Sequence, residues 1–273
     1  MTLSKHEEEL QKFPAELAEA FRAARDFVSS TLTEEEFSLW AESGLSIAKR
    51  AGRSWEAAKE YFKASPTMVK AMPFTYVKQW AYWGSTISEE SPAVAGTYFR
   101  VGPEIAKYLK PWDIPEWAQL GKKLYGSGRR SSALCARYFE VSGDLLRVLS
   151  FTELQHLVLL VESIAERSAD QAIAFLTTSR DVLPSLKEDT RACLSLVSIL
   201  VKGEWQQATK CLEIVAPVLS RIERVERARF LALAGRVAEG SDIDIPAFLR
   251  ESSVALGQIE GHVHVRILNL ADT

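Results

Sequence analysis

A short segment built around Tyr-Phe recurs along the chain at a nearly constant spacing. It is SWEAAKEYFKASP at residues 54–66, SPAVAGTYFRVGP at 91–103 and SSALCARYFEVSG at 131–143. Three apolar pairs continue the register, which gives six copies spaced 36–40 residues apart: Tyr61-Phe62, Tyr98-Phe99, Tyr138-Phe139, Phe175-Leu176, Cys211-Leu212 and Phe248-Leu249. Self-similarity at this period indicates a repeat protein in which each copy packs on its neighbours.

The residues upstream of each Tyr-Phe pair predict an amphipathic helix. Apolar side chains recur three and four residues apart in residues 35–50, 76–90 and 114–126, which is the helical period. Each segment carries Trp followed four residues later by Gly: Trp40/Gly44, Trp80/Gly84 and Trp117/Gly121. Residues four apart share a helix face, and Gly inside a helix costs about 1 kcal/mol relative to Ala. The pairing therefore predicts that a neighbouring helix approaches closely at the Gly.

The Tyr-Phe segment itself predicts a second helix in each copy. Its N-caps are expected at Ser54, Ser91 and Ser168, because a Ser hydroxyl accepts hydrogen bonds from the first free amides. Pro66 and Pro103 follow each pair, and proline is tolerated in the first turn of a helix but not in its interior. We therefore expect a break and a short third helix there. One longer helix bent at the proline is the alternative.

These patterns predict an all-α fold, an α-solenoid of about six armadillo- or HEAT-like helical repeats. Residues 1–31 are expected to form N-terminal capping helices, because residues 14–28 have an apolar face but lack the Trp and Tyr-Phe pattern. Residues 32–260 then form the helical repeat array. Residues 261–273 form a C-terminal tail, in which HVHVRILNL (262–270) alternates as a strand does.

Charge and hydropathy limit the partners. The net charge of −3 and the pI near 5.9 argue against binding nucleic acid or anionic lipid over the whole surface. No stretch of about 18 uncharged apolar residues predicts a membrane span, and MTLSKHEEELQKF lacks the apolar region of a secretory signal. The prediction is a cytoplasmic protein that does not enter a membrane.

The sequence offers no set of residues typical of a catalyst, so we expect no enzyme, no cofactor and no metal. The three cysteines, Cys135, Cys193 and Cys211, are widely spaced in apolar context and are predicted to be buried thiols. His262 and His264 lack a third and fourth metal ligand nearby. Acid pairs such as Glu89-Glu90 are interpreted as solvated helix ends.

Local basic charge singles out one region. Residues 100–150 hold nine lysines and arginines against five acids. GSGRR (126–130) follows a helix rather than a strand, so it is interpreted as a turn between helices and not as a phosphate-binding loop. The candidate partner-binding residues are Arg100, Arg129, Arg130 and Arg137.

The combination W-x-x-x-G, S-W-E-A-A-x-x-Y-F and S-P, as in Trp40-x-x-x-Gly44 with residues 54–66, resembles a known family. It is similar to the helical repeats that precede the von Willebrand A domain in proteins of the NorD/CbbO kind, over roughly residues 32–149. The resemblance implies a partner of a MoxR-type AAA+ ATPase that helps to activate a metalloenzyme. This chain has no D-x-S-x-S motif, so the metal site of the A domain is not carried over.

The sequence therefore predicts a non-catalytic protein-interaction scaffold or adaptor, with a protein partner such as a MoxR-type AAA+ ATPase or a von Willebrand A protein. The alternative is a HEAT-like nucleic-acid-binding protein, similar in architecture to the alkylpurine DNA glycosylases, which would use the basic region at residues 100–150. Convergence of Arg100, Arg129, Arg130 and Arg137 on one face would favour the alternative.

Overall fold

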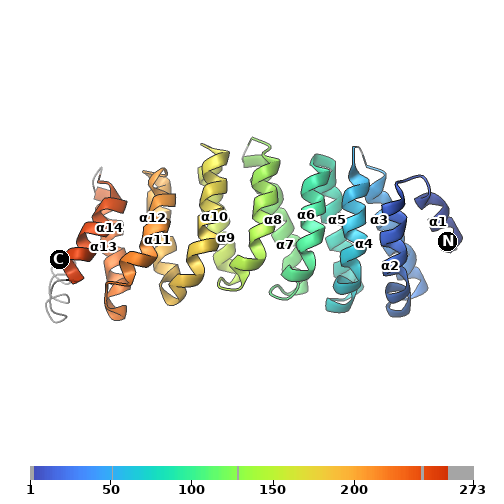
Figure 1. Cartoon of the computed structure of the whole chain (residues 1–273), viewed down its shortest axis with the longest axis horizontal. Helices are drawn as coiled ribbons and strands as arrows, with labels where there is room; N and C mark the ends of the chain where they lie inside the picture. The colour runs from blue at the N-terminus through green and yellow to red at the C-terminus, as the bar shows by residue number, and fades with distance from the viewer. Residues whose placement is uncertain (1–2, 51, 128, 241–242, 258–273) are drawn as a thin grey trace. The chain divides into compact units, whose positions relative to one another are not determined.

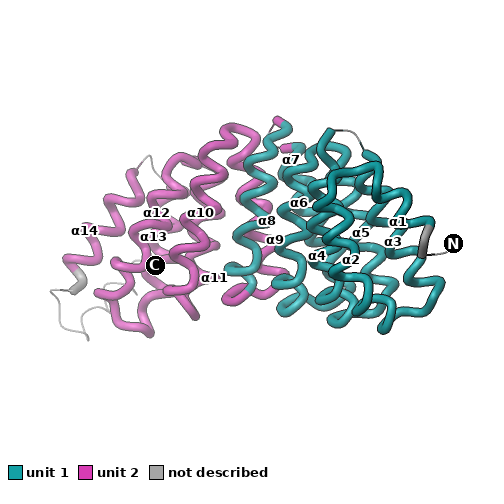
Figure 2. The backbone as a smooth tube through the Cα atoms, turned by 45° about the vertical axis from the view of Figure 1, so that its right-hand side comes forward, with its two compact units in different colours: residues 1–126, 130–146 teal, residues 127–129, 147–273 magenta. Residues whose placement is uncertain are grey.

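The computed structural model describes residues 3–50, 52–127, 129–240 and 243–257, and within these ranges the chain forms helices joined by turns, with no strand. The predicted strand at residues 262–270 and the tail at 261–273 lie outside the described residues. The chain divides into two compact units, shown in different colours in Figure 2. Unit 1 is residues 1–126 and 130–146, and unit 2 is residues 127–129 and 147–273.

Unit 1 consists of two layers of helices. Its helices are α1 (Leu3–Leu10), α2 (Ala15–Thr31), α3 (Glu34–Ala48), α4 (Ser54–Ala71), α5 (Phe74–Glu90), α6 (Pro92–Ile105), η1 (Pro111–Asp113), α7 (Ile114–Ser127) and α8 (Ser132–Leu146). In one layer α4 packs between α2 and α6, and α6 packs on α8; in the other, α3 packs against α1 and α5 (Figure 1). Each of α4, α6 and α8 carries one Tyr-Phe pair.

Unit 2 is also made of paired helices. They are α9 (Phe151–Ala165), α10 (Ala169–Leu186), η2 (Lys187–Asp189), α11 (Thr190–Lys202), α12 (Gln207–Leu219), η3 (Arg224–Glu226), α13 (Arg227–Gly240) and α14 (Ile245–Gly257). Here α12 packs between α10 and α14, and α11 packs between α9 and α13. Phe175, Leu176, Cys211 and Leu249 are fully buried at the register of the Tyr-Phe pairs, so small or aliphatic side chains replace most of the rings.

Helix starts follow the serines in two of three places. The Ser91 Oγ accepts from the Val94 amide at 3.5 Å, and the Ser168 Oγ accepts from the Gln171 amide at 3.3 Å, so both predicted N-caps are confirmed. The prediction for Ser54 was wrong. Ser54 is the first residue of α4, is fully buried, and accepts a hydrogen bond from the hydroxyl of Ser88 at 3.1 Å.

The expected third helix does not form, because α4 and α6 continue through Pro66 and Pro103. The alternative of one longer helix is therefore correct. A proline removes one backbone donor, and a Ser hydroxyl that bonds to the carbonyl four residues earlier allows a helix to bend without being broken. In α4 the Ser65 hydroxyl, next to Pro66, donates to the Tyr61 carbonyl. In α8, which contains no proline, Ser142 makes the equivalent bond to the Tyr138 carbonyl at 2.6 Å.

The core of unit 1 is a recurring contact between Trp of the first helix and Tyr of the second. The Tyr61 hydroxyl donates to the Trp40 carbonyl at 3.3 Å, Tyr98 to Trp80 at 3.1 Å, and Tyr138 to Trp117 at 3.2 Å. All six side chains are at most 1% exposed. A buried hydroxyl needs such a partner, since leaving it unpaired costs about 1–3 kcal/mol. This one hydrogen bond fixes the pairing of the two helices in each copy.

The Gly that follows each Trp provides space for the Phe ring of the same copy. A Cβ at Gly84 would lie 1.9 Å from Cζ of Phe99. The same holds for Gly44 against Phe62 and Gly121 against Phe139, at 2.1 and 2.2 Å. The predicted close approach is confirmed, but it is made by an aromatic side chain rather than by the backbone of a neighbouring helix.

Successive copies are joined through the same rings. Tyr61 lies over Trp80 and edge-on to Phe99 of the next copy, with ring centroids 5.3 and 5.4 Å apart. Tyr98 repeats both contacts with Trp117 and Phe139, at 5.1 and 5.3 Å. In α2, Phe21 takes the place of the Tyr, stacking on Trp40 and meeting Phe62 edge-on, both at 5.3 Å. The N-terminal segment thus makes the same ring contacts as the later copies, although its sequence lacks the Tyr-Phe pair.

The substitution Gly84→Ala tests whether Gly is required by the Phe99 ring. Because the new Cβ overlaps that ring, we expect a loss of about 1–3 kcal/mol in the free energy of unfolding, measured by urea denaturation. Gly96 is the matched control, since it lies inside α6 and a Cβ there meets nothing within 4 Å. Gly96→Ala should stabilise by about 0.5–1 kcal/mol through helix propensity. Equal effects of the two variants would contradict the account of the Gly positions.

Candidate functional site

In unit 1 the ends of α1, α3, α5 and α7 are linked by a series of ion pairs. Glu9 of α1 pairs with Lys49, which follows α3, at 2.9 Å; the adjacent Arg50 pairs with Glu89 of α5; and Glu90 pairs with Lys122 of α7 at 3.3 Å. In each pair of adjacent like charges, Lys49-Arg50 and Glu89-Glu90, the first side chain pairs with the preceding helix of this layer and the second with the following one. Each pair is partly exposed and contributes at most about 1 kcal/mol. They link helix ends whose positions the aromatic core has already set.

Glu9 is held by two lysines. The hydrogen bond from Lys12, together with that from Lys49, lowers the pKa of the Glu9 carboxyl to about 2. The group therefore stays ionised at any pH at which the protein is handled, and α1 stays electrostatically tied to Lys49. Arg25 of α2 adds a second link to α1, with its guanidinium 2.8 Å from the Glu7 carboxylate.

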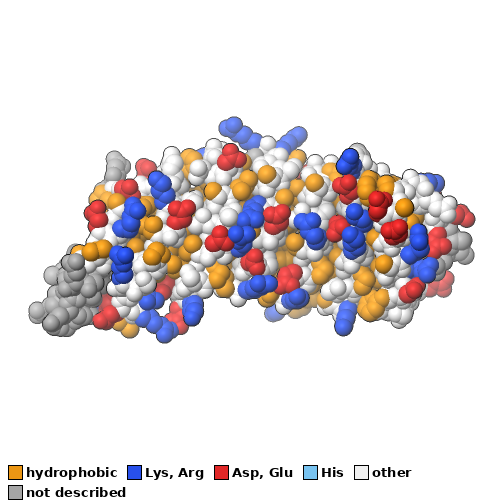
Figure 3. Space-filling view, in the orientation of Figure 1, with side chains coloured by type: hydrophobic (Ala, Val, Ile, Leu, Met, Phe, Trp, Pro, Cys, Tyr) orange, Lys and Arg blue, Asp and Glu red, His pale blue; other side chains and the backbone are white. Residues whose placement is uncertain are grey.

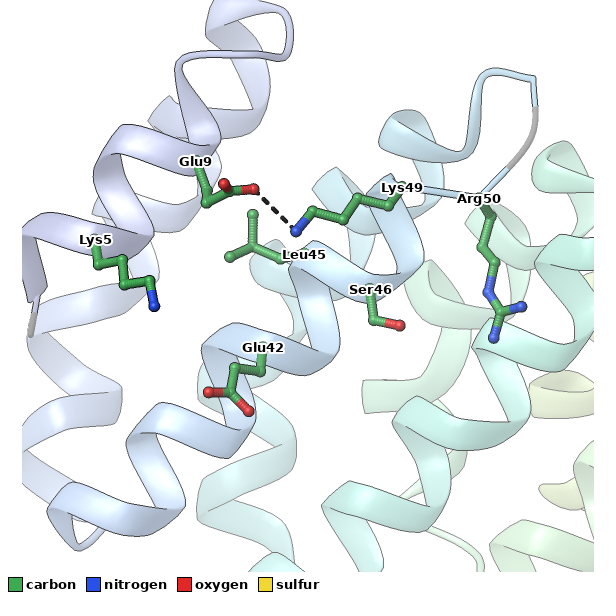
Figure 4. Close-up of a pocket in the computed structure, with 7 residues that line it drawn as sticks. All are labelled: Lys5, Glu9, Glu42, Leu45, Ser46, Lys49 and Arg50. Atoms are coloured by element: carbon green, nitrogen blue, oxygen red, sulfur yellow. Dashed lines mark ion pairs between the residues drawn. The ribbon is translucent and has the colours of Figure 1, made fainter. Parts of the chain in front are cut away.

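A pocket of about 610 Å³ opens between α1 and α3 (Figure 4). Figure 4 shows Lys49 turned towards Glu9, while Lys5 reaches over the same space from α1. The lining side chains are mainly charged or hydroxylic, and Leu45 is an apolar member: Lys5, Glu9, Glu42, Leu45, Ser46, Lys49 and Arg50.

A second pocket of about 360 Å³ continues between α3 and α5. It shares Glu42, Ser46 and Arg50 with the first, so the two pockets lie on either side of α3 and have these three side chains in common. Its lining residues are Leu39, Glu42, Ser43, Ser46, Arg50, Lys78, Ala81, Tyr82 and Ser85. We name the residues that line the two pockets together the α1–α5 groove.

The groove has a definite charge arrangement. Lys49 and Arg50 are neutralised by Glu9 and Glu89, whereas Lys5 and Lys78 form no ion pair within the described part of the chain. Within the same described part, Glu42 accepts one hydrogen bond, a long one of 3.4 Å from the Ser38 hydroxyl, and it lines both pockets. The resting surface is therefore a cation on α1, an anion on α3 and a cation on α5.

Two of the predicted binding residues lie on α6 and α8, and each interacts with a side chain of its own helix. Arg100 of α6 donates to the Thr97 hydroxyl at 3.3 Å, and Arg137 of α8 pairs with Glu140 at 3.3 Å. These pairs take the positions one before and two after the Tyr of each copy, as Glu60 and Lys63 do in α4 at 3.1 Å. Figure 3 shows acidic and basic side chains mixed over the face formed by α4, α6 and α8.

The other two predicted residues lie in the turn between α7 and α8. Arg129 and Arg130 have φ of 55° and 63°, a left-handed conformation that the aligned Gly52 adopts at 70°. Side chains are disfavoured there by about 1–2 kcal/mol per residue. Arg130 lines a pocket with Glu89, Glu90 and Lys122. Arg129 is assigned to unit 2, so the four arginines are not described as one site.

The remaining candidates for chemistry are accounted for by burial. Cys135, Cys193 and Cys211 are buried free thiols, as predicted, and burial raises the pKa of each. The Cys135 thiol donates to the Gly121 carbonyl at 3.0 Å. Among the residues that the structure describes, no group of three or more His, Cys, Asp or Glu side chains could hold a metal, and no helix is long and apolar enough to cross a bilayer. His262 and His264 lie outside the described residues.

Sequence reasoning missed the ion pairs between helix ends, although a signal for them was present. Lys49-Arg50 and Glu89-Glu90 occupy the same register, directly before the turn between the two helices of a copy. Opposite charges at one register of adjacent copies predict contacts between helix ends in a repeat protein. Glu89 and Glu90 were interpreted as merely solvated, which was wrong, since both are paired.

Comparison of the chain with protein-family models, curated proteins and solved structures finds no match.

His6 provides a pH test of how α1 is held. Its ring is 1% exposed, and neither nitrogen has a hydrogen-bond partner among the described residues. Burial lowers its pKa from 6.5, Glu42 opposes this and Lys5 adds to it. Docked α1 therefore needs neutral His6, and its docking should weaken as pH falls below 6.5, by up to about tenfold in the opening equilibrium at pH 5.5.

Amide hydrogen exchange of residues 5–10, corrected for the intrinsic pH dependence of exchange, measures this opening. Protection should fall between pH 7.5 and pH 5.5 in the native protein, and His6→Leu should remove the pH dependence. Protection that is constant over this range in the native protein would show that His6 does not limit the docking of α1.

Proposed function

We propose that the protein is a non-catalytic protein-interaction scaffold or adaptor, built as an α-solenoid of about six armadillo- or HEAT-like repeats. The observation that carries the function is the α1–α5 groove. It is open, it extends over three helices, and it combines charged, hydroxyl and aromatic side chains around apolar contacts. Surfaces with this extent and composition suit a polypeptide better than a small enclosed ligand.

The recurring Tyr–Trp hydrogen bond and ring contacts support the repeat architecture. Helices held at a constant register present their exposed residues as an extended, regularly spaced surface, which is how repeat proteins bind. The degenerate copies in unit 2 keep buried side chains at the same register, including Phe175 and Cys211. We propose that they extend the same scheme with weaker sequence similarity.

The resemblance of residues 32–149 to NorD/CbbO-like repeats makes a MoxR-type AAA+ ATPase, or a von Willebrand A protein, the first partner to test. Nucleic-acid binding through the basic region remains the alternative. Arg100 and Arg137 have partners on their own helices, and acids are mixed with the basic side chains on their face, which favours the protein partner.

Affinity purification from the native host, with nuclease treatment, tests the proposal. We expect an identifiable protein at near-stoichiometric amount, and the purified partner should rebind the purified chain with measurable affinity. Recovery of nucleic acid in place of protein, or glycosylase activity on alkylated DNA, would overturn the scaffold and support the alternative.

Charge reversal of Arg129 and Arg130 to Glu tests the contribution of the exposed turn. With an acidic partner, the association rate should fall and become less dependent on salt, because exposed charges mainly steer encounter. The same two charges reversed at Lys202 and Lys210, which are also exposed, form the control. An equal change in both variants would show only an effect of net charge.

A further inference from the structure

We infer that the α1–α5 groove binds an extended peptide segment that carries two acidic side chains about six residues apart, with a basic or hydroxyl side chain between them. The inference rests on the proposed function, since it names the kind of partner that the scaffold takes. It is carried by Lys5, Glu42 and Lys78, none of which forms an ion pair with another residue that the structure describes.

The order of these charges along the groove determines the order of charged side chains along the ligand. Lys5 lines the part of the groove between α1 and α3, Lys78 lines the part between α3 and α5, and Glu42 lines both. A segment lying across α3 therefore meets a cation, an anion and a cation in turn. Its complement is acidic, then basic or hydroxylic, then acidic, because like charges brought together across an interface are penalised.

The spacing of the acidic side chains follows from helix packing. Axes of neighbouring packed helices lie about 8–10 Å apart, so α1 and α5, on either side of α3, are about 16–20 Å apart. An extended chain advances about 3.3 Å per residue. Two carboxylates that reach Lys5 and Lys78 together are therefore separated by about five or six residues.

The other lining residues fit a peptide lying across α3. Ser46 and Ser85 line the groove and offer hydroxyls to a peptide backbone, while Ala81 belongs to its apolar part. Tyr82, at 64% exposure, is large and rigid and adds an aromatic contact at the α5 side. Lys49 and Arg50 already hold Glu9 and Glu89, so a ligand that depended on them would have to break ion pairs between helices.

Fluorescent Gly/Ser peptides of equal length test the pattern by anisotropy at physiological salt. Probe one has Glu at positions 3 and 9 and Lys at position 7, which places all three side chains on one face of an extended chain. Probe two has the same residues with both Glu adjacent, and probe three has Glu in place of the Lys. Probe one should bind at least about fivefold more tightly than either of the others. Equal affinity for the three probes would overturn the inference.

Variants locate the contact on the protein. Lys5→Glu and Lys78→Glu should each weaken probe one by about three- to tenfold, the range expected when one exposed ion pair is replaced by repulsion. Lys70→Glu is the matched control, because Lys70 is exposed on α4 in the other layer of unit 1. Unchanged circular dichroism and Tm show that each variant is folded. An equal loss with Lys70→Glu, or displacement of probe one by inorganic phosphate at millimolar concentration, would make the groove a general anion site and overturn the inference.

The natural partner separates this inference from the scaffold function. If an identified partner binds the native chain and the Lys5→Glu/Lys78→Glu variant equally well, the groove inference is wrong and the scaffold function stands. If probe one binds with the predicted pattern but no protein partner is recovered from the host, the groove chemistry is supported and the scaffold function fails.

Discussion

The structure of unit 1 depends on one recurring interaction, the contact of a buried Tyr with the Trp of its own copy and with the rings of the next. Within a copy, the Tyr98 hydroxyl bonds to the Trp80 carbonyl; between copies, the Tyr98 ring stacks on Trp117 and meets Phe139 edge-on. A net hydrogen bond contributes about 1 kcal/mol, and an aromatic pair about 0.5–1.5 kcal/mol beyond its buried area. The same residue thus stabilises its own helix pair and attaches the next one.

This interaction determines where the charged residues of the surface lie. Because α3, α5 and α7 are each fixed by a Trp and a Gly, their ends reach the same level in successive copies. Arg50 can then pair with Glu89, and Glu90 with Lys122. These ion pairs are partly exposed and individually weak. The aromatic core therefore determines the register, and the charges provide specificity on a surface that is already in place.

The sequence predicted much of this architecture and little of the surface. Helices, their period and the burial of the rings followed from spacing, because burial of apolar faces imposes a strict pattern. The continuity of α4 through Pro66 could not be read from the sequence, since it depends on tertiary packing and on the Ser65 hydroxyl. The sequence did not show that Phe21 is equivalent to the Tyr of the later copies, because Phe21 shares only the ring contacts and has no hydroxyl. The groove was missed because Lys5 and Lys78 are far apart in the sequence and neither belongs to a recognisable motif.

A double-mutant cycle between Tyr61 and Phe99, measured by urea denaturation, tests the central claim that the rings couple neighbouring copies. The two rings are 5.4 Å apart and belong to successive copies. Substituting each with Leu, singly and together, should reveal a coupling energy of about 0.5–1.5 kcal/mol, whereas Tyr61 with Tyr138, which lie two copies apart, should give additive effects within about 0.5 kcal/mol. Additive effects for Tyr61 and Phe99 as well would contradict the account, because the copies would then be held together by burial alone and not by the matched rings.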